Sequence, residues 1–351
     1  MGQKRFLQIL VVVMAVSLLS GLIWGIHHTI KRAIAAQTHT QILCLPSFSQ
    51  PSLCYPAETQ LSTQPTTAIA TTPRDKWLVS SNKNQIDVWD LTTGQQVRSL
   101  QGHSQWVTAL AISPNGNTLA SGSLDGTINL WDLATGTLQA TLFARHVTVL
   151  AFSPDGSTLA SGNRLITATA PKIFHPLQLW DVGQGQLLAN LTVEEPITAI
   201  AFSPDGQRLA AGTAATKVWD LPTQAYLYTV ASGDLNTLTF SADGQLLLTG
   251  SDGIQGEDGI KMWDARTGKL ARVLDSVAAD FALSPDGSVL ITTYGGNANF
   301  WQMQPFQFLG TLRGSTYSGL TAKFGLSGRA IAMGSSDGVK VWYSQPLQRN
   351  N

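Results

Sequence analysis

The sequence predicts an all-β fold: a seven-bladed β-propeller closed by an N-terminal strand and preceded by one transmembrane α-helix. Three observations carry this prediction. An apolar strand that ends in Trp recurs seven times, a Ser-Pro-Asn-Gly or Ser-Pro-Asp-Gly turn recurs in step with it, and an uncharged stretch of 21 residues stands near the N-terminus. We expect a basic tail over residues 1–5, a transmembrane helix over 6–26, a flexible linker over 27–57 and the propeller over 58–351.

The composition favours many short strands joined by tight turns. Of the 351 residues, 43% are hydrophobic, enough for a large core, whereas only 13% are charged, about half of the usual share. The 32 glycines and 10 tryptophans fit strands and turns better than long solvated helices. Lys plus Arg number 22, as do Asp plus Glu, with no long run of either sign. A nucleic-acid binder, which usually has a basic face, is therefore not expected.

Residues 6–26 have the length and composition of a membrane-spanning helix. They carry no charge, and at 1.5 Å per residue they would form a helix about 31 Å long, which matches a hydrocarbon core of about 30 Å. Trp24 stands near the end of the stretch, and Lys31 and Arg32 follow it. A cleaved signal peptide is the alternative, since residues 33–35 (Ala-Ile-Ala) resemble a cleavage site, but secretory apolar regions are usually shorter.

Basic residues flank this segment on both sides, so they decide its orientation only weakly. Lys4 and Arg5 precede it, and Lys31 and Arg32 follow it. We slightly prefer the orientation in which the short tail, residues 1–5, stays in the cytoplasm and the large domain is exported. We therefore expect a single-pass membrane protein with its propeller on the non-cytoplasmic side.

The only cysteines, Cys44 and Cys54, both lie in the expected linker, which is rich in Ala, Gln, Thr, Ser and Pro. Their spacing fits no metal-ligand pattern. An oxidising compartment would allow a disulfide across the short loop between them. Two unpaired thiols in a flexible linker are the alternative.

The strands that end in Trp divide the rest of the chain into seven repeats. Their spacings are 42, 49, 39, 44, 38 and 41 residues, a period typical of a propeller. The seven residues are Trp89, Trp131, Trp180, Trp219, Trp263, Trp301 and Trp342.

The turns between strands follow the same period. Proline presets φ for a turn, and glycine adopts the positive φ that closes it. Thr-Gly marks a second turn, after the Trp strand. Each repeat should therefore hold four short strands, denoted a to d, with strand c ending in Trp. The first kind of turn begins at Ser113, Ser153, Ser203 and Ser284, with a relaxed copy that lacks proline at Ser241.

The two ends of the domain are expected to meet in the last blade. Few residues follow Trp342, and Pro346 interrupts them, so the seventh repeat has no convincing strand d of its own. Residues 58–62 precede the first strand a at the spacing that strand d has elsewhere, and would supply the missing strand. Such closure removes an open sheet edge.

The most complete repeat carries the motifs of a known family. It contains Gly102-His103, then VTALAISPNG over residues 107–116 and LASGSLDGT over 119–127, and it ends at Trp131-Asp132. In these motifs the chain resembles the WD-repeat (WD40) β-propeller family over about residues 58–351. The resemblance implies a hydrogen-bonded structural tetrad, with Ser123 as a second candidate for its serine; the tetrad residues are His103, Ser121, Asp125 and Trp131.

Nothing in the sequence points to catalysis, a cofactor or a metal. A Ser/His/Asp set suggests hydrolase chemistry, but buried polar groups in a blade need partners, so the structural interpretation is preferred. We find no HExxH, phosphate-binding loop, GxSxG or dinucleotide fingerprint. The acidic stretch 252–259 lacks the alternating ligands of a calcium loop and is interpreted as an extended loop. Asp280, in strand a, either lines the central channel or, as we prefer, is satisfied locally.

The resemblance places the loops that join strand d to a, and strand b to c, on one face of the propeller, which we call the top face. The irregular segments of the sequence fall there. Aromatic and Arg side chains most often dominate interfaces, and loops free of packing duties often carry function. The candidate partner-binding residues are Trp106, Arg145, Arg164, Phe174, His175, Tyr294 and Tyr317.

These features predict a membrane-anchored scaffold or adaptor, not an enzyme, whose top face binds a protein partner. Two alternatives stay open. One is an exported propeller enzyme or small-ligand binder that uses the central channel, for which only Asp280 stands out. The other is a structural subunit of a membrane complex that contacts its neighbours through the blade rims, where residues 306–309 (Phe-Gln-Phe-Leu) form a candidate apolar patch.

Overall fold

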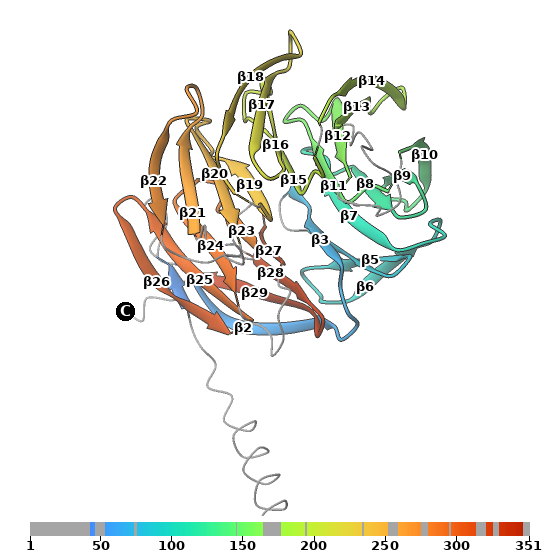
Figure 1. Ribbon diagram of the computed structural model, residues 1–351. Helices are drawn as coiled ribbons and strands as arrows, with labels where there is room; N and C mark the ends of the chain where they lie inside the picture. The colour runs from blue at the N-terminus through green and yellow to red at the C-terminus, as the bar shows by residue number, and fades with distance from the viewer. Residues whose placement is uncertain are drawn as a thin grey trace, which may run out of the picture. The chain divides into compact units, whose positions relative to one another are not determined.

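The computed structural model contains seven antiparallel sheets, built from the 29 strands of the described part of the chain (Figure 1). The tail and membrane helix expected over residues 1–26 lie outside that part. Among the described residues, no helix is long and apolar enough to cross a membrane. The structure describes residues 43–45, 53–73, 76–144, 146–163, 177–193, 195–233, 235–251, 259–274, 280–294, 296–313, 321–325 and 330–346.

Each sheet is one blade, and the blades are numbered one to seven along the chain. The innermost strands a contact those of the neighbouring blades and so form a ring. They are β3 Ala68–Thr71, β7 Val107–Ile112, β11 Val149–Phe152, β15 Ala199–Phe202, β19 Thr237–Phe240, β23 Asp280–Leu283 and β27 Thr321–Phe324. Strands b follow, and are β4 Trp77–Asn82, β8 Thr118–Ser123, β12 Thr158–Gly162, β16 Arg208–Gly212, β20 Leu246–Ser251, β24 Val289–Tyr294 and β28 Ala330–Ser335.

Strands c carry the recurring tryptophans, and strands d form the outer edges. Strands c are β5 Gln85–Asp90, β9 Thr127–Asp132, β13 Leu177–Asp181, β17 Thr216–Asp220, β21 Gly259–Asp264, β25 Asn297–Met303 and β29 Gly338–Pro346. Strands d of blades one to six are β6 Gln96–Leu100, β10 Leu138–Phe143, β14 Gln186–Leu191, β18 Ala225–Val230, β22 Leu270–Leu274 and β26 Phe306–Arg313. The four strands of repeats one to six, and the three of repeat seven, are those that the turns and the Trp positions predict.

The strand sequences match their depth in the blade. In strand β8 all residues after Thr118 are buried, because neighbouring blades cover both faces of the sheet, and its sequence accordingly lacks polar and apolar alternation. The outer strand β10 is mostly exposed, apart from Leu142 and the half-buried Ala140. Burial on both faces therefore selects small and apolar residues in strand b, whereas strand d tolerates polar ones.

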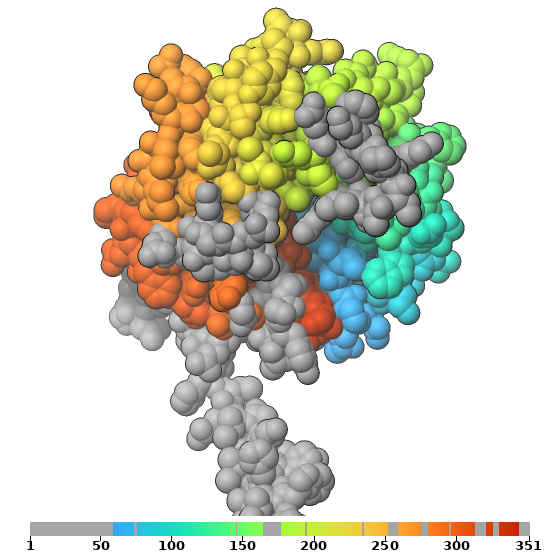
Figure 2. Space-filling view, in the orientation of Figure 1, coloured from blue at the N-terminus to red at the C-terminus, as the bar shows by residue number. Residues whose placement is uncertain are grey.

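The core lies between the blades. Seven apolar clusters are found among the described residues, and each joins side chains of two adjacent blades. Neighbouring blades can approach each other closely because strand b carries small residues. A Cβ atom added to Gly122 would lie 2.5 Å from Cγ1 of Val147 in the next blade, closer than side chains pack. The blades therefore pack against one another through their sheet faces, and the colour gradient in Figure 2 shows that the described residues follow one another around the molecule in sequence order.

An N-terminal strand closes the ring. β2, Leu53–Ser62, pairs antiparallel with β29, with Glu58 opposite Trp342. It supplies the strand d that the seventh repeat lacks, as the sequence predicts. On the inner side, the Thr71 hydroxyl of blade one donates a hydrogen bond of 3.1 Å to the Phe324 carbonyl of blade seven.

The boundary between linker and propeller is different from the expected one. β2 begins at Leu53, so the boundary placed at residue 58 falls inside a strand. A further short strand, β1 (Leu43–Leu45), pairs with β2 and makes the seventh blade five-stranded. Cys44 and Cys54 are direct cross-strand partners in that pairing. The end of the presumed flexible linker is therefore part of the last sheet.

Candidate functional site

The tryptophan of strand c anchors most blades through its indole N–H. In five blades this group donates to a Ser or Thr hydroxyl on strand b, over 2.8 to 3.1 Å. Blades four and seven have Ala211 and Met333 at the position of that hydroxyl. Those two blades therefore depend more on apolar packing.

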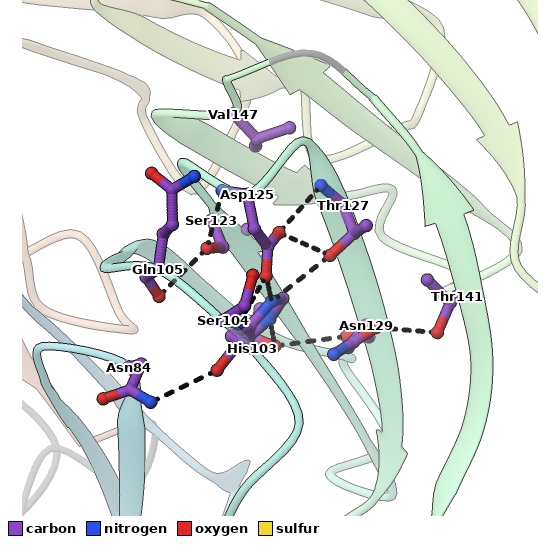
Figure 3. A network of polar contacts seen from close by, with 12 residues as sticks. Asn84, His103, Ser104, Gln105, Ser123, Asp125, Thr127, Asn129, Thr141 and Val147 are labelled. Carbon is purple, nitrogen blue, oxygen red and sulfur yellow. Dashed lines mark hydrogen bonds and ion pairs between the residues drawn. The ribbon is translucent and has the colours of Figure 1, made fainter.

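Blade two extends this contact into a buried network that contains all four predicted tetrad residues. Trp131 Nε1 donates to Ser121 Oγ over 2.8 Å, and Ser121 Oγ lies 2.8 Å from His103 Nε2. His103 Nδ1 lies 3.0 Å from Asp125 Oδ2. Because an ionised carboxylate only accepts hydrogen bonds, this partner assigns a ring proton to Nδ1. Figure 3 shows His103 and Asp125 facing each other.

Asp125 ties the loop before strand a to the turn before strand c. Its Oδ2 accepts the Ser104 amide over 2.9 Å, and its Oδ1 accepts the Thr127 hydroxyl over 2.7 Å. Burial by itself raises the pKa of Asp125, but the hydrogen bonds from Thr127, Ser104 and His103 outweigh it, and the pKa falls below its ordinary value of 3.8. The carboxylate is therefore ionised at neutral pH.

The arrangement favours a structural role for this Ser/His/Asp set. Ser121 is fully buried, and its oxygen accepts the Trp131 indole N–H, so the hydroxyl faces the interior and no substrate reaches it. Ser123, the second candidate for the tetrad serine, instead donates to the Gln105 carbonyl over 3.2 Å. The network holds the loop that carries Gln105 and Trp106 against the blade.

Asp280 is satisfied by its neighbours, as we preferred. Its Oδ2 accepts the Thr321 hydroxyl over 2.8 Å and lies 3.7 Å from Lys323 Nζ of the same neighbouring strand. Its Oδ1 accepts the Phe281 amide over 2.8 Å. In the part of the chain that the structure describes, no group of three or more His, Cys, Asp or Glu side chains could hold a metal ion.

Two candidate partner-binding residues are described, and both are exposed at the top face. Trp106 lies in the loop from β6 to β7 and exposes 54% of its surface, and Tyr294 ends β24 and exposes 53%. The Trp106 carbonyl accepts the Leu124 amide over 3.0 Å, so the backbone is held while the indole faces solvent. The other candidates, Arg145, Arg164, Phe174, His175 and Tyr317, lie outside the described residues.

Phe143 is an exposed aromatic residue that sequence reasoning missed. It ends β10, opposite Thr127, on the top side of blade two, and exposes 82% of its surface. The sequence offers one signal of this exposed position: Phe143 is an aromatic residue at the end of a strand d, just before a d–a loop. Trp106 and Phe143 thus belong to the same blade as the tetrad.

The blade rims carry further apolar side chains. Large apolar residues are exposed on each of the six outer strands from β6 to β26, for example Leu188 on β14 and Phe308 on β26. The patch expected at residues 306–309 is only partly available, because the Phe306 ring stacks on Trp301 with centroids 5.6 Å apart.

Comparison with known proteins identifies the repeats. The profile of the family described as WD domain, G-beta repeat matches residues 94–132, 136–164, 185–220 and 224–264. The chain is similar to guanine nucleotide-binding protein subunit beta of Oryza sativa subsp. indica and of Oryza sativa subsp. japonica, each 27% identical over 308 residues that cover 77% of this chain and 78% of the relative. The corresponding subunit of Zea mays is 26% identical over the same shares. The chain therefore contains segments that match WD40 repeats, and these segments lie within the seven-bladed propeller.

Proposed function

We propose that this chain is a protein-binding scaffold whose propeller recruits a partner through its top face and is held at a membrane by residues 6–26. The observation that carries the proposal is the pair of aromatic side chains, Trp106 and Tyr294, each more than half exposed on top-face loops. Large aromatic residues that remain solvated in a monomer are typical anchors of protein interfaces.

The support beneath Trp106 favours binding. The tetrad fixes the loop that precedes the residue, and the Leu124 amide holds its carbonyl. A partner therefore does not have to order this loop when it binds, which lowers the entropic cost of association. The relatives are named as subunits of a guanine nucleotide-binding protein, that is, as members of a protein assembly, which agrees with a protein partner here.

The top-face proposal is tested by recovering partners with the full chain and with a Trp106→Ala/Tyr294→Ala variant. We expect the variant to lose the proteins that the wild type retains. Tyr226→Ala is the matched control, because Tyr226 is exposed to a similar extent but lies on outer strand β18, just after the c–d turn at the other face. Equal recovery by the wild type and the double variant would contradict the proposal.

The membrane attachment rests on the uncharged stretch of 21 residues from Phe6 to Ile26. Deleting residues 1–32 should move the chain from the alkali-resistant membrane fraction to the soluble fraction. Mass spectrometry of the mature N-terminus separates an anchor from a cleaved signal peptide. A chain that begins after residue 35, or a full chain extracted by alkali, would refute the anchor.

A second candidate function is that of a structural subunit that packs through its rim. The exposed apolar residues on all six outer strands from β6 to β26 favour it, because contiguous apolar patches often mark association sites. Cross-linking of the detergent-solubilised chain, with Leu188→Asp as the rim variant, tests it. Rim assembly requires that the cross-linked species disappear in this variant and persist in Trp106→Ala/Tyr294→Ala.

A further inference from the structure

A groove of about 800 Å³ separates blades five and six on the face opposite the top face. Its walls are the a–b turns of the two blades, at Ser241–Asp243 and Asp286–Ser288, and its outer end is formed by the blade-six turn Gln304–Pro305. This volume is within the range of pockets that bind ligands, about 300–1,000 Å³.

The turns that line the groove differ in composition from those of most other repeats. The a–b turns of blades one, two, three, four and six contain proline. Across the seams from blade one to blade five, the proline ring lies against the turn glycine of the next blade: Cδ of Pro204, for example, would be 3.4 Å from a Cβ atom on Gly244. Blade five has Ala242 instead of proline, and Ala242 faces Gly287 with only its methyl group. The Ala242 methyl carbon would lie 3.4 Å from a Cβ atom on Gly287, so the two turns are as close as those of blades four and five, and the seam differs in having a methyl group in place of the proline ring.

The second departure lies in blade six. Its strand c carries Trp301-Gln302 instead of Trp-Asp, and Gln304–Pro305 replaces the Thr-Gly turn found after Trp263. The floor of the groove is apolar, built from Met262, Met303 and Phe306. The Arg272 guanidinium lies 5.6 Å from the centre of the Phe306 ring, so this cation is already placed over an aromatic partner.

Two carboxylates stand on opposite walls of the groove at equivalent turn positions. Asp243 Oδ1 accepts the Ser241 hydroxyl and the Gln245 amide, and Asp286 Oδ1 accepts the Ser284 hydroxyl and the Ser288 amide. The Oδ2 atoms have no hydrogen-bond partner among the described residues and are available to a ligand.

Both groups are ionised at neutral pH. Hydrogen bonds from Ser241 and Gln245 hold the pKa of Asp243 below its ordinary value. For Asp286, burial raises the pKa, but hydrogen bonds from Ser284 and Ser288 outweigh that effect and the net direction is also downward. The groove therefore combines an apolar floor and two negative walls with one positive side chain, Arg272, which lies over Phe306.

We propose that this groove binds an extended peptide segment of a partner protein in which an apolar side chain stands beside a Lys or Arg. The apolar side chain packs on Met262, Met303 and Phe306, and the cation lies between Asp243 and Asp286, where a charge-assisted hydrogen bond forms. The site is separate from the top face, so a scaffold of this kind holds two partners at once.

The chain itself offers a variant that removes the charge and keeps the turns. In blade two the equivalent position is Asn115, whose Oδ1 accepts the Ser113 hydroxyl over 2.7 Å and the Asn117 amide over 2.9 Å. Asp243→Asn/Asp286→Asn should therefore fold normally. Asp155→Asn/Asp205→Asn makes the same change in the turns of blades three and four and is the matched control.

A second variant fills part of the groove. Ala242→Pro gives this turn the Ser-Pro-Asp-Gly sequence of blades three, four and six, so it is compatible with the fold, and it places a larger ring at a residue that lines the groove. The probe is a display library of short random peptides selected on the full chain. Synthetic versions of the selected peptides are then measured by fluorescence anisotropy, with Gln in place of Lys or Arg in a parallel set.

We expect the selected peptides to pair an apolar residue with Lys or Arg. Affinity should fall at least about tenfold in Asp243→Asn/Asp286→Asn and in Ala242→Pro, and stay unchanged in the control. The proposal is overturned by a selection without binders, by peptides lacking a basic residue, or by equal affinity for wild type and both groove variants. Partner recovery that depends on Trp106 should be the same in the groove variants, so the two sites succeed or fail separately.

Discussion

Gly102 lies directly against the indole ring of Trp131: a Cβ atom added to Gly102 would be 2.8 Å from Cη2 of that ring. The residue before the tetrad histidine thus has no room for a side chain, because the loop must pass over the tryptophan to bring His103 to Ser121. This contact explains the Gly-His pair of the second blade in steric terms.

Gly102→Ala should therefore destabilise the propeller. Overpacking of this kind typically costs about 1–3 kcal/mol, and denaturant unfolding measures the loss. Gln101→Ala, at the exposed neighbouring position, is the control and should change the unfolding free energy by less than about 0.5 kcal/mol. A Gly102→Ala protein as stable as the wild type would show that the loop moves freely away from Trp131.

Ser121→Ala should also destabilise the fold. The substitution removes the oxygen that joins Trp131 Nε1 to His103 Nε2 and leaves two buried polar groups without this partner, at a cost of about 1–3 kcal/mol. Ser104→Ala is the matched control, since only the backbone amide of that exposed residue bonds to Asp125. Comparable stability of the two variants would rule out the tetrad as a stabilising network.

Acidification should weaken the protein through Asp125. Its pKa is lowered in the folded state, so its contribution is fully present above the unfolded value, near 3.8, and is lost as the pH falls through the lower, folded pKa. When the unfolding free energy is measured from pH 7 to pH 2, it should fall less steeply with decreasing pH in Asp125→Asn than in the wild type. If the unfolding free energies of the two proteins fall equally with pH, other carboxylates cause the acid sensitivity.

The closing strand should contribute as much as a core strand. Leu61 on β2 is buried against Leu78 and Val341 in the cluster that joins blades seven and one. Leu61→Ala should cost about 2–5 kcal/mol. Leu188→Ala, an equally conservative change on the exposed outer strand β14, should fall within about 0.5 kcal/mol of the wild type. Similar small effects of both would mean that β2 is dispensable for closure.

The oxidation state of Cys44 and Cys54 should indicate the compartment of the propeller, because disulfides form in oxidising compartments. Direct partners in an antiparallel pair have Cα atoms about 4.5 or 5.5 Å apart, within the range that a disulfide spans, and these two residues are such partners. If protease digests the propeller in intact cells, thiol labelling under non-reducing conditions should find both cysteines blocked. Protease protection together with free thiols would place the propeller in the cytoplasm, and a digested propeller with free thiols would refute the disulfide.

Much of the fold could be predicted because each blade is a local unit. The Trp at the end of strand c and the Ser-Pro-Asp-Gly turn recur with one period, and the pairing of neighbouring strands follows from hairpins. The tetrad was predictable for the same reason, since its residues lie within a single repeat. The short strand β1 was not predicted, because three residues show no alternation, and it forms only where β2 already offers an edge.

The number of blades, the position of the tryptophans and the strand that closes the ring follow from periodicity and local turn chemistry, and both can be read from the amino-acid sequence. Which departures from the repeat matter depends on how distant segments pack in the folded protein. Ala242 and Gln304–Pro305 are more than 60 residues apart in the chain, yet they border one groove. The half-burial of Phe306 and the exposure of Phe143 were likewise set by neighbouring side chains. A groove between blades arises from the volume that two non-adjacent segments leave unfilled, and no single repeat contains that information.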